Sequence, residues 1–333
     1  MKSFAFAAIA ACAVATIDVE ELSFIDYLSK WNKVYHDIDE FRVRLEHFVR
    51  NGHIINEHNA TESSYKLGHN QFSDWSPEEY SRILGYKRGT RLLKADGGDC
   101  ENPTLATNGL PTEVNWVDAG AVTGVKDQGA CGSCWAFSTT GSLEGAHFVA
   151  TGELLSFSEQ QLVSCNKTSI NQGCNGGFQD EAYKYYEDGA KAELESVYPY
   201  TSGNYGYDGK CLYDEASTTA VTVSNYTCVT PSQVDQMKAA VANQPTAVAI
   251  QANMPCFQFY HSGVMDNQNC GTNLDHAVLA VGYGTDAATG KDYWLVKNSW
   301  NTSWGDKGYI KLAIVEGDGT CGVQMDPITP VTN

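Results

Sequence analysis

The decisive stretch of this chain is Gln128-Gly129-Ala130-Cys131-Gly132-Ser133-Cys134-Trp135-Ala136-Phe137. Its two cysteines have two competing interpretations. In the first, Cys131 and Cys134 form a dithiol, either a thioredoxin-like redox pair or half of a zinc site. In the second, Cys131 belongs to a structural disulfide and Cys134 is a free nucleophile at the start of a helix. A helix is predicted because apolar residues recur at helical spacing before Gly152: Leu143, Ala146 and Ala150.

The second interpretation gives each polar residue around Cys134 a chemical role. Cysteine attacks as a thiolate, and the positive end of a helix and a neighbouring imidazolium both lower the thiol pKa. His276, 142 residues after Cys134, is the candidate that takes the thiol proton and later protonates a leaving amine. Asn298, 164 residues after Cys134, would orient that imidazole. Gln128 carries an amide N–H₂ that could join the Cys134 backbone N–H in an oxyanion hole.

The pattern Cys-Gly-Ser-Cys-Trp with a downstream His and Asn resembles the active-site region of papain-family cysteine proteases. The redox interpretation leaves His276, Asn298 and Gln128 without a role. Two upstream motifs extend the resemblance to cathepsin L-like proenzymes. One is E-x3-R-x3-F-x2-N-x3-I-x3-N, matched by Glu40, Arg44, Phe48, Asn51, Ile55 and Asn59. The other is G-x-N-x-F-x-D, matched by Gly68-His-Asn70-Gln-Phe72-Ser-Asp74.

The resemblance implies an α+β, papain-like fold of two subdomains, a helical half and a β-barrel-like half, preceded by a small helical inhibitory propeptide. It implies a cysteine endopeptidase, made as a zymogen, that hydrolyses peptide bonds through a Cys134 thioester. The tail of the propeptide would cross the active-site cleft backwards relative to substrate. A catalytically inactive homologue that only binds peptides is the alternative, and the intact Cys134, His276 and Asn298 argue against it.

Composition along the chain predicts its organisation. Residues 1–15, an apolar run after Lys2, are predicted to be a signal peptide. Residues 16–109 would be the propeptide, ending in a cleavable linker over about 85–109. Residues 110–333 would be the mature peptidase, helical over about 110–220 and strand-rich over 221–333. The predicted strand runs are Thr246–Ala252, Ala277–Tyr283, Tyr293–Lys297 and Tyr309–Val315. Cys134 then comes from one half and His276 and Asn298 from the other, which suits a cleft for long peptides.

The 11 cysteines fit an oxidising secretory route. The resemblance implies three disulfides: Cys131–Cys174, Cys165–Cys211 and Cys270–Cys321. Removal of Cys12 with the signal peptide leaves Cys100, Cys228 and Cys256. We predict a fourth bridge, Cys228–Cys256, although no pattern fixes the distance between them. The alternative is that Cys100 tethers a retained propeptide fragment, as in cathepsin H, which would make the enzyme an aminopeptidase.

The resemblance also assigns substrate-binding residues. Gly176 and Gly177 would pair with an extended substrate backbone, and Trp300 would shield the His276–Asn298 pair from water. The substrate residue called P2 comes directly before the residue whose carbonyl is attacked. Its side chain would enter a pocket beside Asp275. Its lining would be Phe178, Gln179, Ala249, Leu274 and Asp326. Apolar P2 side chains would bind by burial. Asp326 would accept Arg or Lys, or would turn to solvent with apolar substrates.

The formal charge of −18 argues against nucleic-acid binding. We expect no cofactor, no metal and no membrane span. The expected partners are protein and peptide substrates, the chain's own propeptide and cystatin-like inhibitors. The expected location is the secretory pathway, ending in a lysosome, an acidic vacuole or the extracellular space. Glycosylation sequons begin at Asn59, Asn166, Asn225 and Asn301, and Asn301 stands where most relatives have Gly, in a turn that Asn tolerates.

Overall fold

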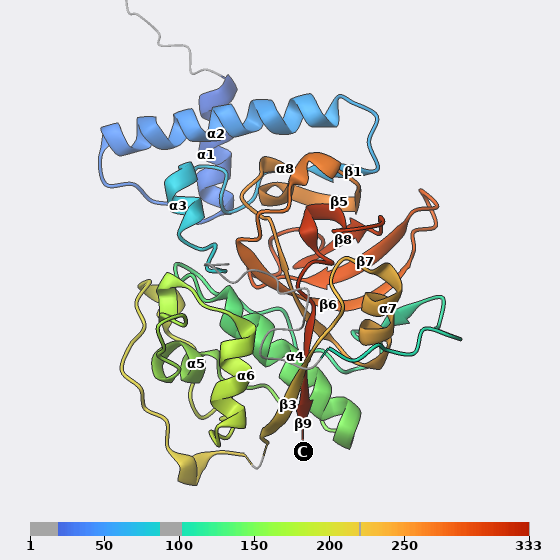
Figure 1. Ribbon diagram of the computed structural model, residues 1–333. Helices are drawn as coiled ribbons and strands as arrows, with labels where there is room; N and C mark the ends of the chain where they lie inside the picture. Colours follow the sequence, from blue (N-terminus) through green and yellow to red (C-terminus); the bar gives the residue numbers. More distant parts are fainter. Residues whose placement is uncertain (1–18, 87–101, 220, 333) are drawn as a thin grey trace, which may run out of the picture.

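The computed structural model describes residues 19–86, 102–219 and 221–332. The predicted signal peptide, much of the predicted linker and Cys100 lie outside these residues. The chain forms a helical N-terminal domain, residues 19–86, that lies across one end of a larger two-part body (Figure 1). Of the helices in the described ranges, none is long and apolar enough to cross a membrane.

The N-terminal domain contains α1 (Val19–Lys30), α2 (Ile38–Asn59), β1 (Tyr65–Leu67) and α3 (Pro77–Ser81). Asp37 is the N-cap residue of α2, and its carboxylate accepts hydrogen bonds from the N–H groups of the first turn. Helix α3 begins with a capping box formed by Ser76 and Glu79. Phe24, Tyr27 and Phe48 form the buried core between α1 and α2. Strand β1 pairs antiparallel with β5 (Tyr260–Met265), so this domain extends the sheet of the larger body.

The helical half is built around α4 (Cys134–Thr151), with α5 (Glu159–Cys165) and α6 (Gln179–Glu187) beside it. Gly152 ends α4 in the left-handed conformation, with φ 79°, as the sequence pattern predicts. Its core includes Trp135, Leu162 and Tyr183. Two strands that follow residue 220, β3 (Val223–Cys228) and β9 (Ile328–Thr332), also contribute to this core. Three short 3₁₀ helices complete this half: η1 (Gly173–Asn175), η2 (Ser202–Asn204) and η3 (Glu215–Ser217).

The β half supplies most of the sheet. Its elements are α7 (Val234–Asn243), β4 (Thr246–Ile250), α8 (Pro255–Gln258), β5, η4 (Gln268–Cys270), β6 (His276–Thr285), β7 (Asp292–Lys297), β8 (Tyr309–Ala313) and η5 (Thr320–Gly322). The strand order in the described residues is β1-β5-β8-β7-β6-β4-β9-β3, and β2 (Val114–Asn115) pairs with β6. The four predicted strand runs coincide with β4, β6, β7 and β8. Thus the α+β fold predicted from the sequence is confirmed.

The structure contains the three disulfides Cys131–Cys174, Cys165–Cys211 and Cys270–Cys321. The predicted bridge Cys228–Cys256 is wrong, because Cys256 is a free, buried thiol, whereas Cys228 is disulfide-bonded to another cysteine. The topology gives the reason. Cys228 ends β3 at one edge of the sheet, whereas Cys256 lies in α8, which leads into β5 near the opposite edge.

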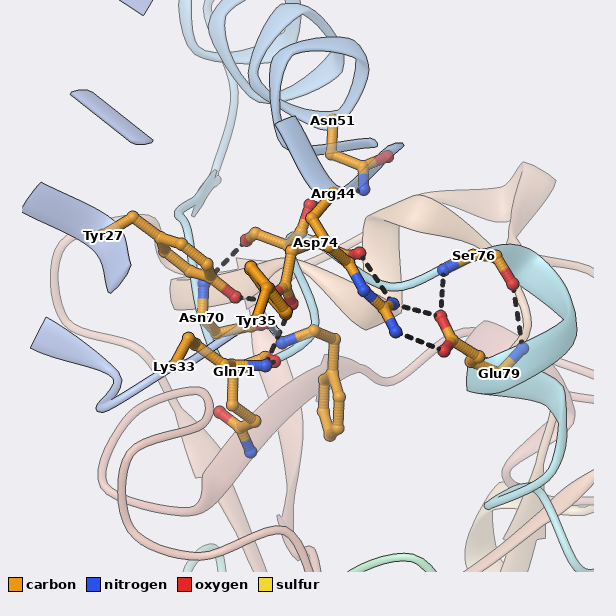
Figure 2. Close-up of polar contacts among 12 residues, drawn as sticks. Tyr27, Lys33, Tyr35, Arg44, Asn51, Asn70, Gln71, Asp74, Ser76 and Glu79 are labelled. Atoms are coloured by element: carbon orange, nitrogen blue, oxygen red, sulfur yellow. Dashed lines mark hydrogen bonds and ion pairs between the residues drawn. The ribbon is translucent and has the colours of Figure 1, made fainter. Parts of the chain in front are cut away.

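One buried carboxylate, Asp74, joins the parts of the N-terminal domain (Figure 2). Its side chain is 1% exposed and accepts hydrogen bonds from Tyr27 Oη at 2.8 Å, from Lys33 Nζ at 2.9 Å and from Tyr35 Oη. Arg44 of α2 donates to the Asp74 carbonyl at 3.2 Å and forms a two-point ion pair with Glu79 of α3 at 2.5 and 2.8 Å. The motif residues Arg44 and Asp74 therefore hold the helices and the following segment in one arrangement.

We predict that Asp74→Asn lowers the stability of the N-terminal domain by roughly 3 kcal/mol, because it leaves the Lys33 ammonium without its counter-charge. The measurement is denaturant unfolding of the full chain carrying Cys134→Ala, followed by tryptophan fluorescence. Asp39→Asn is the matched control, since the Asp39 side chain is 88% exposed and pairs only loosely with Arg42 at 3.5 Å. Equal unfolding midpoints for the two variants would contradict the assignment.

His69 carries a half-buried imidazole in the same domain. Its ring stacks on Phe48 with centroids 4.2 Å apart, and its Nδ1 has no hydrogen-bond partner among the described residues. Burial, assisted by the nearby Lys30 charge, lowers the pKa of His69 to about 4 from 6.5. Between these two values the unfolded domain binds a proton that the folded domain does not. The stabilising contribution of neutral His69 is therefore present above pH 6.5 and is lost as the pH falls toward 4.

We predict that His69→Phe, which keeps the ring stack and removes the proton, lets the N-terminal domain stay folded at lower pH. The gain near pH 4 is about 1–2 kcal/mol, after allowance for partial exposure of the ring. Limited proteolysis of the Cys134→Ala chain across pH 7 to 4 reports the change. His53→Phe is the control, because the His53 side chain is 71% exposed. An unchanged acid transition in the His69 variant would show that other groups control it.

Candidate active site

The stretch from Gln128 to Ser133 turns sharply and places Cys134 in the first turn of α4. The Cys131–Cys174 disulfide fixes the turn from one side, and the Gly132 N–H donates to the Cys174 carbonyl at 3.0 Å. Ser133 is the N-cap residue, but its side chain does not cap the helix and instead hydrogen-bonds Tyr200 Oη at 2.7 Å. Cys134 is therefore a free thiol at the positive end of a buried helix.

His276 begins β6, and its imidazole is fully buried. Its Nε2 lies 2.8 Å from Asn298 Oδ1, which also accepts the Ser299 N–H at 2.8 Å. Because Asn298 Oδ1 acts as the acceptor in both bonds, the imidazole must carry its proton on Nε2. Its Nδ1 is then free to accept a hydrogen bond. Nδ1 is buried and has no partner among the described residues. Trp300 covers the ring, with centroids 4.5 Å apart and planes at 25°.

The Gln128 side chain is held in one orientation. Its Oε1 accepts from Ser299 Oγ at 2.7 Å and from Trp300 Nε1 at 3.1 Å. Its Nε2 donates to the Cys131 carbonyl at 2.9 Å and to the Ile83 carbonyl at 2.8 Å. Because Ile83 belongs to the N-terminal domain, the donor predicted for an oxyanion is bound to a carbonyl of that domain.

The tail of the N-terminal domain crosses the site in extended form. The Gly177 N–H donates to the Gly85 carbonyl at 2.9 Å, and the Tyr86 N–H donates to the Asp275 carbonyl at 3.0 Å. Tyr86 and Gly177 form a parallel bridge. Gly176, with φ 109°, shapes the turn that presents Gly177. The backbone groups predicted to bind an extended peptide thus bind this segment.

The predicted P2 pocket is filled by the Tyr86 side chain. Tyr86 belongs to one buried cluster with Cys134 and Ala277, together with the predicted lining residues Phe178, Ala249 and Leu274. Its hydroxyl donates to Asp326 Oδ2. Gln179 does not offer its amide to the pocket, since Nε2 donates to Ser138 Oγ and to the Val248 carbonyl, both at 3.2 Å.

The N-terminal domain, residues 19–86, forms a cover over the site and changes the pKa values of the groups beneath it. Burial raises the pKa of Cys134 to about 11, although the backbone N–H groups of Ala277, Gly85 and Trp135 oppose it. Burial lowers the pKa of His276 to about 4, although the hydrogen bond that its Nε2 donates to Asn298 opposes this shift. The low thiol pKa expected from the sequence is therefore absent in the covered state, because desolvation outweighs the helix terminus. Burial also raises the pKa of Asp275 to about 6.

Aromatic contacts anchor the cover over the site. Phe72 and Tyr80 meet the Trp300 ring edge-on, with centroids 5.1 and 5.7 Å away. Gln71 Nε2 donates to the Trp300 carbonyl at 2.8 Å, and Tyr80 Oη donates to the Ala252 carbonyl at 2.9 Å. Trp300 thus packs on both His276 and the N-terminal domain.

Sequence reasoning missed three contributors: Ile83, Tyr86 and Ser299. Ile83 acts through a carbonyl, which carries no sequence signal. Tyr86 falls at the start of the predicted linker, although its position shortly after the Asp74 motif could have marked it as part of the cover.

In the described residues, no group of three or more His, Cys, Asp or Glu side chains could hold a metal ion.

The papain family cysteine protease profile matches residues 110–331, and the cathepsin propeptide inhibitor domain (I29) matches residues 24–80. The probable cysteine protease RD21B of Arabidopsis thaliana is 45% identical over 291 residues, or 86% of this chain; the chain spans only 60% of that relative's length. Digestive cysteine proteinase 1 of Homarus americanus is 42% identical, with 92% of this chain and 94% of the relative covered. The solved digestive procathepsin L 3 of Tenebrio molitor larval midgut superposes with a TM-score of 0.81 at 34% identity, covering 94% and 99% of the two chains.

Proposed function

The chain belongs to the papain family of cysteine proteases, and we propose that it is the latent precursor of a cysteine endopeptidase acting through Cys134. The observation that carries the proposal is the convergence of four groups beneath the chain's own N-terminal domain. These groups meet at the seam of the two halves: the Cys134 thiol at a helix terminus, the His276 imidazole with a free Nδ1, the Asn298 amide that orients this ring, and the Gln128 amide donor. This set suits acyl transfer from a peptide.

In the proposed reaction, His276 Nδ1 takes the proton of Cys134 as Sγ attacks the substrate carbonyl carbon. The oxyanion forms against Gln128 Nε2 and the Cys134 backbone N–H. His276 then protonates the leaving amine, which departs as the thioester forms. A water molecule, deprotonated by the same imidazole, hydrolyses the thioester. Asn298 holds the ring in place and stabilises its charged form.

The N-terminal domain would keep this chemistry silent in two ways. It occupies the positions of substrate groups: the Ile83 carbonyl takes the Gln128 donor, and Gly85 takes the Gly177 N–H. It also removes water from the Cys134–His276 pair, which favours the neutral thiol and imidazole. Removal of the domain restores water to the site and lets the thiolate–imidazolium pair form.

We further propose that the enzyme travels the secretory pathway to a lysosome-like vacuole or the cell exterior, where cystatin-like proteins could inhibit it. Of the four sequons, Asn59 and Asn166 use their side-chain amides in internal hydrogen bonds to Leu67 and Glu181. Asn301 is exposed and adopts φ 64°, as expected for the turn it occupies. It is therefore the sequon best placed to carry a glycan near the cleft. The comparisons favour the endopeptidase over the aminopeptidase alternative.

We predict that Cys134→Ala abolishes peptide hydrolysis and leaves the purified precursor uncut at acid pH. The measurement combines hydrolysis of a fluorogenic peptide with titration by a thiol-directed epoxide, which should consume one thiol as activity disappears. Cys256→Ala is the matched control, because Cys256 is the other free cysteine in the described residues and should be dispensable. Self-cutting by the purified Cys134 variant would refute the assignment of the nucleophile.

We predict that Gln128→Glu lowers kcat by about 10²–10³-fold, because it replaces the oxyanion donor with a carboxylate oxygen. The change preserves an acceptor for Ser299 and Trp300, so the fold should be retained. Steady-state kinetics on the processed enzyme give the measurement. Gln172→Glu, an exposed change of the same kind, should leave kcat within about twofold. A Gln128 variant as active as this control would remove Gln128 from the oxyanion hole.

A further inference from the structure

We propose that the P2 pocket selects tyrosine and that Asp326 recognises its phenol hydroxyl. The inference rests on the proposed function and extends it by naming the substrate class: extended peptide segments with Tyr at P2. It comes from the residue that fills the pocket in the latent state, which is a tyrosine of this same chain.

Tyr86 fits the pocket over its whole side chain. The residue is 3% exposed, and its ring meets the Phe178 ring edge-on, with centroids 4.9 Å apart and planes at 82°. Ala249 and Leu274 form apolar walls that are 0% and 5% exposed. Met325, partly buried, packs against the same cluster. The pocket is therefore an apolar slot for a flat ring.

The far end of the slot is polar. The hydroxyl of Tyr86 donates to Asp326 Oδ2, and a carboxylate is an acceptor only. A phenylalanine would fill the same walls but would leave this carboxylate half-buried without a donor, which is unfavourable. Tyrosine satisfies both the walls and the acceptor.

Lysine and arginine also carry donors, but the slot suits them less. Their long side chains lose more rotamer freedom than a tyrosine ring when they are ordered. They also present methylene groups rather than a ring face to Phe178. The basic preference considered from the sequence therefore becomes the alternative outcome of the test.

The direction of the covering segment does not affect this argument. Its backbone forms a parallel bridge with Gly177, whereas the substrate is expected to run the other way. The pocket walls are side chains that contact the ring, and Gly177 has no side chain to favour one direction.

The first experiment uses the processed enzyme and three peptides that differ only at P2, which is Tyr, Phe or Arg. We expect kcat/KM for Tyr to exceed that for Phe by about 10-fold, as for a partly exposed hydrogen bond to a charged group. Asp326→Ala should bring the Tyr-to-Phe ratio close to one, while Asp326→Asn, which keeps an acceptor, should retain a preference for Tyr. Glu153→Ala is the control, since it removes an exposed carboxylate at the far end of α4 and should preserve the ratio.

Each other result overturns the proposal. A Tyr-to-Phe ratio unaffected by Asp326→Ala would show that Asp326 does not recognise the hydroxyl. A preference for Arg that Asp326→Asn abolishes would show that the pocket recognises charge. If the processed wild-type enzyme cleaved none of the three peptides, the proposed function would be refuted, and the inference with it.

A second measurement does not depend on catalysis. In the full chain carrying Cys134→Ala, Tyr86→Phe and Asp326→Ala should each lower the thermal unfolding midpoint, and the double variant should fall little further than either single variant. This non-additivity is the signature of a direct interaction. Additive losses would show that the hydroxyl and the carboxylate do not recognise each other.

Discussion

The covered active site depends on one close approach between two backbones. A β-carbon added to Gly85 would lie 1.8 Å from the Gly132 carbonyl oxygen, and one added to Gly132 would lie 2.9 Å from the Arg82 carbonyl oxygen. Only glycine leaves room for such contacts. Because Cys134 follows Gly132 by two residues, the crossing brings the main chain of the N-terminal domain close to the Cys134 thiol. The Asp74 network and the Trp300 contacts hold the N-terminal domain so that this crossing can form.

The same crossing explains why the latent site is electrically neutral. Burial disfavours the thiolate of Cys134 and the imidazolium of His276 together, so neither charge can stabilise the other. Acid acts on this balance through two imidazoles, His69 and His276, whose pKa values are lowered to about 4. Protonation of these two imidazoles therefore favours release of the N-terminal domain from the site as the pH falls from 6.5 to 4. Asp275 opposes them: its pKa is raised to about 6, so it stabilises the covered state at low pH and loses that contribution as the pH rises through 6.

Much of this arrangement could be predicted from the sequence, and particular residues show where prediction stopped. Chemistry-bearing side chains at family spacing identified Cys134 and His276 as candidates, and helix and strand periodicity placed α4 and β6. The Cys228–Cys256 bridge failed because spacing along a chain gives no distance across a sheet. The contacts of Ile83 and Gly85 were invisible because they are made by backbone groups, which every residue carries. Pairing of β1 with β5 joins segments about 200 residues apart, and no local pattern encodes it.

The seam between the halves is polar, and this polarity helps to position the side-chain amide of Asn298. Lys126 Nζ lies 3.0 Å from Glu144 Oε1 and 2.6 Å from Glu159 Oε1, and both carboxylates are 1% exposed. Thr123 donates to Glu144 and accepts from Lys297 Nζ at 3.1 Å, so the network reaches the residue before Asn298. Burial lowers the pKa of Lys297 to about 8. An apolar seam could slide between similar packings, whereas these directional bonds fix β7 against α4. Since Cys134 begins α4 and Asn298 follows β7, the register of the seam determines where the Cys134 thiol lies relative to the Asn298 amide and the His276 imidazole bound to it.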